Sequence, residues 1–266
     1  MTEAKNDITL DGTQFLYEAP EALHSAVHAD LRFRRDGAPL ANVGEVTLIP
    51  LLVGEFPQAM MHYPIVFAGP EKAPLAVMGL SNSGNLFVRD GLFEDGAYVP
   101  AYLRRYPFTL AGAGEEQFVV CIDRQAKGFV NEGDGEMLFS DGEPTEFTKH
   151  AIAFLNEYEA ERKRTQTFVE MLDRADLFEV KHTLFVDGAT GEQENVAEYF
   201  AVSEEKMHEL LEGELADYVK SGSMAAIHAH LFSLQRWDGL IGRRAKAASN
   251  TTEQPETVDS EELVDA

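Results

Sequence analysis

Residues 142–178 read GEPTEFTKHAIAFLNEYEAERKRTQTFVEMLDRADLF, and this stretch decides the fold class. Apolar residues recur along it at steps of three and four, a spacing that places them on one face of a helix: Phe147, Ala151, Phe154, Leu155, Tyr158, Phe168, Met171 and Leu172. Thr145 is suited to cap the helix N-terminus, with Pro144 just outside it. The charged run 157–164 falls largely on the opposite face and is expected to be solvated. The stretch therefore predicts one long helix.

Short strands precede this helix. Apolar runs broken by Gly and Pro predict strands at residues 46–50, 65–67, 75–80, 85–88 and 117–123. Little helix separates them, which favours an antiparallel or mixed sheet over a doubly wound one. After the long helix come strands at 182–186 and 198–202, a helix capped by Ser203 that ends near Gly213, and a final helix over 223–246. The predicted fold class is α+β, with a mostly antiparallel β core and helices concentrated in the C-terminal half.

Composition limits the classes of function. The chain has 266 residues, a hydrophobic fraction of 44% and a net charge of -24. The negative field of a chain with this net charge would repel the phosphates of a nucleic acid, so nucleic acid is not an expected partner. No apolar stretch reaches the roughly 18 residues of a membrane span, and no secretory signal opens the chain, so we expect a cytoplasmic protein without membrane insertion. We predict a single domain over 1–246 and a disordered acidic tail over 247–266.

Familiar catalytic and cofactor signatures are missing. The chain has no GxSxG elbow, no P-loop, no GxGxxG and no HEXXH, so we predict no cofactor and no metal. Cys121, the only cysteine, lies in an apolar run and is expected to be a buried strand residue. His228 and His230 point to different faces of a helix, so at least one should be a hydrogen-bonded packing residue.

The strongest candidate site combines residues 62–67, HYPIVF, with residues 98–108, YVPAYLRRYPF. Pro100 can open a short helix that places Tyr102 and Tyr106 on one face. Arginine offers a planar fork for carboxylate or phosphate and stacks on aromatic rings. The alternative is structural: the arginines pair with internal carboxylates while the tyrosines pack. The candidate ligand-binding residues are His62, Tyr63, Asn85, Tyr98, Tyr102, Arg104, Arg105 and Tyr106.

Four segments together carry a family resemblance. They are HYPIVF at 62–67, GLSNSGNLFV at 79–88, YVPAYLRRYPF at 98–108 and AHLFSLQRW at 229–237. The chain resembles the bacterial SapC family over residues 40–245. The family is named for a protein linked to the paracrystalline surface layer, and its members have no assigned reaction. Relatives are often encoded beside flavin-dependent halogenase-like proteins and outer-membrane receptors, which implies pathway partners of that kind and a role in surface or peptide modification. The peptide-transporter permease of the same name is excluded, because this sequence has no membrane spans.

Two hypotheses follow. The first is a non-catalytic accessory protein that binds a peptide or protein client, with an open groove around Tyr102, Arg104 and Arg105. The second is an enzyme of unrecognised type acting on a peptide or small anionic substrate. It would need His62 beside Arg105 in an enclosed pocket, because proton transfer requires hydrogen-bond reach.

Overall fold

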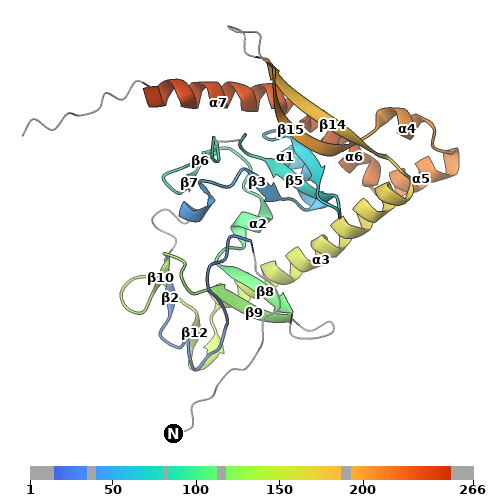
Figure 1. Ribbon diagram of the computed structural model, residues 1–266. Coiled ribbons are helices and arrows are strands. Elements are labelled where there is room, and N and C mark those ends of the chain that lie inside the picture. Colours follow the sequence, from blue (N-terminus) through green and yellow to red (C-terminus); the bar gives the residue numbers. More distant parts are fainter. Residues whose placement is uncertain (1–14, 35–39, 81–82, 113–117, 187–192, 253–266) are drawn as a thin grey trace, which may run out of the picture.

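The protein is described by a computed structural model that covers residues 15–34, 40–80, 83–112, 118–186 and 193–252 (Figure 1). Its fold is α+β, as predicted, with antiparallel sheets and most of its helix in the C-terminal half. None of the helices in these ranges has the length and hydropathy needed to cross a membrane.

The largest sheet has five antiparallel strands. Its order is β14-β15-β4-β5-β3, and the strands are β14 (Phe178–Val186), β15 (Gln193–Val202), β4 (Ile65–Ala68), β5 (Ala73–Val77) and β3 (Leu48–Pro50). Val66 and Phe67 of β4 are buried, as is Ile65, so this central strand reads as one apolar run. The sheet belongs to a large apolar cluster that also includes Phe168 and Leu172 of the long helix.

A second group of strands has its own apolar cluster, formed by Leu31, Phe33, Phe108, Ile122, Leu138, Phe139 and Leu155. One sheet has the order β1-β9-β8, with β1 (Pro20–Ala22), β9 (Phe118–Asp123) and β8 (Phe108–Gly112). Another has the order β10-β2-β11, with β10 (Phe129–Val130), β2 (Arg32–Phe33) and β11 (Glu136–Met137). Two small hairpins pair β6 (Val88–Arg89) with β7 (Leu92–Phe93), and β12 (Phe139–Ser140) with β13 (Glu143–Pro144).

The long helix α3 (Glu146–Arg174) joins the two clusters. It runs from beside β8 and β9 toward α5 (Glu212–Lys220) (Figure 1). Leu155 contributes to the smaller cluster, whereas Phe168 and Leu172 contribute to the larger one. The side chain of Thr145 accepts a hydrogen bond from the amide of Thr148 at 3.4 Å, so the predicted N-cap is confirmed. The apolar stripe of this helix is long because it packs against both clusters in turn.

The other helices are all shorter than α3. They are the 3-10 turns η1 (Ala41–Val43) and η2 (Val53–Glu55), and the helices α1 (Phe56–Ala59), α2 (Ala101–Arg104), α4 (Glu204–His208), α5 (Glu212–Lys220), α6 (Ser223–Ser233) and α7 (Arg236–Thr252). Ser203 caps α4 as predicted, accepting a hydrogen bond from the amide of Lys206. The segment predicted to be an acidic tail begins inside α7, and its residues 253–266 lie outside the described ranges.

Three predicted elements differ from the structure. Residues 85–87 form a turn rather than a strand, because the Asn85 side chain donates to the Val46 carbonyl and accepts from the Phe87 amide. The helix predicted to end near Gly213 divides into α4 and α5. The helix predicted over 223–246 divides into α6 and α7, because the amides of Leu234 and Gln235 bond to carbonyls only three residues back and so leave the α-helical pattern. Ser233, the last residue of α6, accepts a hydrogen bond from the Ile65 amide of β4.

His230 is a fully buried packing residue, with 0% exposure, that ties α6 to the large sheet. Its Nδ1 lies 2.8 Å from the Ile65 carbonyl, and its Nε2 accepts the Val202 amide at 3.1 Å. The Ile65 carbonyl can only accept, so Nδ1 carries the proton, and the Val202 amide can only donate, so Nε2 carries none. The ring is therefore neutral. Burial lowers the pKa of His230 from 6.5 to about 4. The prediction that one of the two neighbouring histidines is a hydrogen-bonded packing residue is confirmed.

Acid should therefore destabilise the fold through His230. The unfolded chain binds a proton near pH 6.5, whereas the folded chain binds it near pH 4, so stability falls as pH falls through that window. The expected loss in the free energy of unfolding is about 3 kcal/mol. His230→Gln, which can offer the same donor and acceptor without titrating, should remove this loss in urea titrations between pH 7 and pH 4. His228→Gln, on an exposed position of the same helix, should leave it in place. An unchanged pH dependence in His230→Gln would refute the assignment.

Candidate functional site

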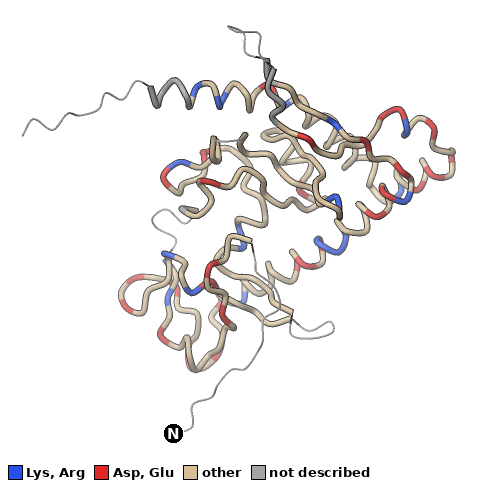
Figure 2. The backbone as a smooth tube through the Cα atoms, in the orientation of Figure 1, with Lys and Arg blue, Asp and Glu red and all other residues tan. Residues whose placement is uncertain are grey.

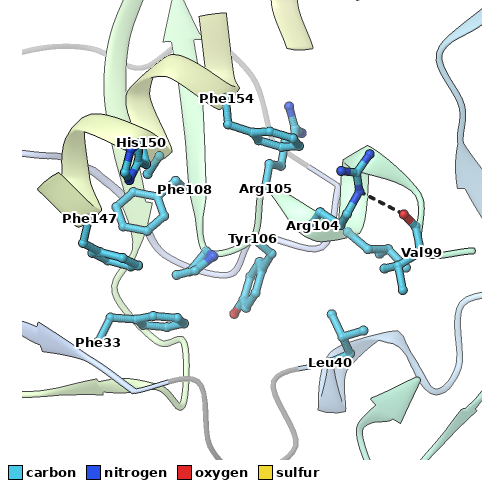
Figure 3. Close-up of a pocket in the computed structure, with 13 residues that line it drawn as sticks. Phe33, Leu40, Val99, Arg104, Arg105, Tyr106, Phe108, Phe147, His150 and Phe154 are labelled. Carbon is cyan, nitrogen blue, oxygen red and sulfur yellow. Dashed lines mark hydrogen bonds between the residues drawn. The ribbon is translucent and has the colours of Figure 1, made fainter. Parts of the chain in front are cut away.

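A cavity of about 520 Å³ opens where the two apolar clusters meet (Figure 3). The α2 turn forms one wall and the first two turns of α3 form another. Its apolar lining consists of Phe33, Leu40, Val99, Leu103, Pro107, Phe108, Phe147, Ala151 and Phe154, and its polar lining consists of Arg104, Arg105, Tyr106 and His150. We call it the α2–α3 cavity. Its walls include four phenylalanines, and the rings of Phe33 and Phe147 stack at 6.0 Å.

Glu55 fixes the α2 wall from beneath. This carboxylate is only 6% exposed, and it accepts hydrogen bonds from the Ala101 amide at 2.6 Å, the Tyr98 hydroxyl at 2.7 Å and the Leu52 amide at 2.8 Å. Pro100, the N-cap of α2, provides no side-chain cap. Glu55 therefore serves as a distant cap, which satisfies an amide that the short helix leaves open.

Arg104 lies at the rim of the cavity. Its Nε donates to the Val99 carbonyl at 3.0 Å and its Nη2 donates to the Tyr98 hydroxyl at 3.2 Å. Nη2 also lies 3.8 Å from Glu55, and the side chain is 46% exposed. The guanidinium stands over the ring of Phe154 at 5.3 Å. Arg104 thus meets both sequence-based hypotheses: it is paired with an internal carboxylate, and it borders a cavity.

Arg105 is held among tyrosines. Its guanidinium lies 4.1 Å from the ring centre of Tyr102, 4.6 Å from that of Tyr158 and 5.5 Å from that of Tyr17. The rings come from three separate parts of the chain, so this cation–π cluster joins them. Burial raises the pKa of Tyr158 to about 12, and the positive charge of Arg105 opposes that rise. Arg105 therefore has a structural role at the floor of the cavity.

The tyrosines of the segment face structural partners. The Tyr102 hydroxyl donates to the Phe15 carbonyl at 2.6 Å, and the Tyr106 hydroxyl donates to Asp123 at 3.2 Å. Asp123 also accepts hydrogen bonds from the amides of Glu18 and Ala19. Through Asp123, the segment around residues 18 and 19 is therefore linked to Tyr106 in the cavity wall. Of the tyrosines predicted as ligand contacts, Tyr106 lines the α2–α3 cavity.

The remaining predicted residues lie away from the cavity lining. Tyr63 is fully buried and donates to the Tyr98 carbonyl, which is the contact between the two signature segments. Asn85 holds the turn described above. His62 is half-buried, and burial, followed by the charges of Arg236 and Arg243, lowers its pKa. His62 does not line the α2–α3 cavity. The arginines whose charges act on it are Arg236 and Arg243, whereas Arg105 lies among Tyr17, Tyr102 and Tyr158.

A sequence model of the SapC family matches residues 23–240, which include every residue that lines the cavity. The chain belongs to the SapC family. Comparison with curated proteins found no match, and comparison with solved structures also found none.

Several cavity residues of this SapC-family protein were not predicted as a site. Phe147 and Phe154 were recognised as part of the helix stripe, but their spacing gives no sign that they border a hollow. His150 and Phe33 lie far apart in sequence, and Glu55 looks like any surface acid. Within the described ranges, no three His, Cys, Asp or Glu side chains form a group that could hold a metal ion.

Proposed function

We propose that this SapC-family protein is a non-catalytic accessory protein that binds a peptide or protein client through the α2–α3 cavity. The observation that supports this proposal is the cavity lining itself, four phenylalanines with one half-exposed arginine at the rim. Its volume of about 520 Å³ falls in the range of roughly 300–1,000 Å³ that ligand pockets occupy. Such a lining suits a large apolar or aromatic side chain of the client.

Arg104 would fix the orientation of the bound segment. Its Nε and Nη2 donate to the Val99 carbonyl and the Tyr98 hydroxyl, and Nη1 makes no hydrogen bond to the described residues. A guanidinium at a cavity rim can donate to a main-chain carbonyl or a carboxylate of the client. Arg105 is committed to its three tyrosines, so we assign recognition to Arg104 alone.

The enzyme hypothesis gains no specific support. It needs His62 beside Arg105, yet His62 packs on Tyr63 near Arg243, and Arg105 packs on Tyr102 and Tyr158. The family name leads us to place the client in a surface-layer or peptide-modification pathway, with flavin-dependent halogenase-like proteins as candidate pathway partners.

A phage-displayed library of random twelve-residue peptides, selected on the immobilised full-length protein, tests this proposal. Enriched peptides should share an aromatic or large aliphatic residue. Phe154→Asp should weaken their binding by at least roughly tenfold, because it removes an apolar wall and adds an unpaired charge. Arg104→Ala should weaken it about fivefold through the lost hydrogen bond.

The matched control is Phe232→Asp. It makes the same chemical change at a phenylalanine that is 59% exposed on α6, outside the cavity. Its binding should equal that of the unaltered protein. Failure to enrich any peptide, or binding that a folded Phe154→Asp variant retains in full, would refute the proposal.

A further inference from the structure

Two further hollows lie beside the α2–α3 cavity along α3. A middle hollow of about 440 Å³ shares Arg104 and Phe154 with the cavity. A far hollow of about 490 Å³ shares Leu52 and Tyr158 with the middle one. Each hollow therefore adjoins the next, and α3 lines all three from Phe147 to Asp173.

The length of this run suits an extended chain. Between Phe147 and Asp173 the helix axis covers about 39 Å, at about 1.5 Å per residue. An extended peptide covers the same distance with about 12 residues, at about 3.3 Å each. A small molecule or a single side chain would fill one hollow and leave the others empty.

The lining changes along the run. The cavity at the start is aromatic. The middle hollow carries three carboxylates and two arginines, and Glu161 is paired with Arg164 and Glu55 with Arg104. Glu157, which is exposed there, has no ion pair with the described residues. The far hollow is lined by apolar residues that include Leu51 and Val169. Charged residues also line it: Glu71, Lys72, Arg162, Glu170 and Asp173.

The charges on this protein indicate that the bound segment is positively charged. Figure 2 shows acidic and basic residues interspersed along α3. The exposed carboxylate of Glu157 can pair with a cation in the middle of the run, and the net charge of -24 attracts a basic segment from a distance.

We propose that the client is an extended basic segment that lies along α3. Large apolar side chains occupy the α2–α3 cavity and the far hollow, and a lysine or arginine between them pairs with Glu157. This inference rests on the proposed function and deepens it, because it specifies the length, charge and path of the bound segment.

End-specific crosslinking tests the path. The native Cys121 is buried, so a thiol introduced at exposed His150 in the cavity, or at exposed Gln166 in the far hollow, reacts selectively. The two positions lie about 24 Å apart along the helix. The probe is a selected twelve-residue peptide with a bromoacetyl group at one end or the other. One end should alkylate His150→Cys and the opposite end Gln166→Cys, whereas Phe232→Cys should react with neither.

The role of charge needs its own pair of variants. Glu157→Lys should weaken the same peptide about fivefold, and Glu209→Lys, an equal change of net charge at an exposed residue outside the run, should leave binding unchanged. A peptide cut to about five residues around its aromatic anchor should lose most of its affinity, because the far hollow then stays empty.

The outcomes separate the two proposals. If both ends label only His150→Cys, or the short peptide binds as tightly as the long one, the extended path is wrong while cavity binding stands. If the folded Phe154→Asp variant also binds the peptide with unchanged affinity, both proposals fail. Self-association that Phe154→Asp abolishes would show that a second copy of the chain occupies the run, which would overturn a peptide client.

Discussion

Replacing Glu55 with alanine should lower the free energy of unfolding by about 3–5 kcal/mol, because it leaves buried donors without an acceptor. The Ala101 amide, the Leu52 amide and the Tyr98 hydroxyl all donate to this carboxylate. The loss should also loosen α2, whose first turn has no other side-chain cap. Urea denaturation followed by circular dichroism measures the change.

Glu157→Ala provides the matched control for that experiment. Glu157 is an exposed glutamate on α3 that also borders the middle hollow, so the same substitution removes the same charge without burying a donor. It should change stability by no more than about 0.5 kcal/mol. If Glu55→Ala cost as little as Glu157→Ala, Glu55 would not be the anchor of the α2 wall.

Arg105→Ala should cost about 3 kcal/mol, because it removes a cation from three aromatic rings and leaves a void among them. Arg105→Lys should restore only part of this, since a lysine ammonium lacks the planar face that stacks on tyrosine. Thermal and urea unfolding of both variants measure the effect.

The neighbouring arginine should behave in the opposite way. Arg104→Ala should change stability by less than about 1 kcal/mol, because the side chain is half exposed, yet it should weaken peptide binding. A stable Arg105→Ala protein, or an Arg104→Ala protein that unfolds readily, would contradict the division of labour between these adjacent residues.

The sequence predicted the parts of the fold that depend on local periodicity. The long helix, its Thr145 cap, the buried strand at 65–67 and the fold class are confirmed because their signals lie within one turn or one strand. The break between α6 and α7 was missed. Ser233 at the end of α6 accepts a hydrogen bond from Ile65, 168 residues away, and no local pattern reveals such a contact.

Of the candidate site, the sequence revealed only the part that lies within one short segment. The 98–108 segment was recognised from its composition, and the structure places Arg104, Arg105 and Tyr106 in the cavity lining. The different partners of the two arginines could not be predicted, because Glu55 and Tyr158 reach them through the folded chain. His62 and Asn85 belong to segments that carry the family resemblance, but neither residue lines the α2–α3 cavity.

Hydrogen exchange of the full-length protein, with and without a selected twelve-residue peptide, tests the central claim most directly. We predict that the peptide slows amide exchange in residues 99–108 and 147–154, the two segments that line the α2–α3 cavity. Slowed exchange confined to residues 62–67 and 236–243, around His62 and Arg243, would contradict the claim and move the binding site to the other signature segment.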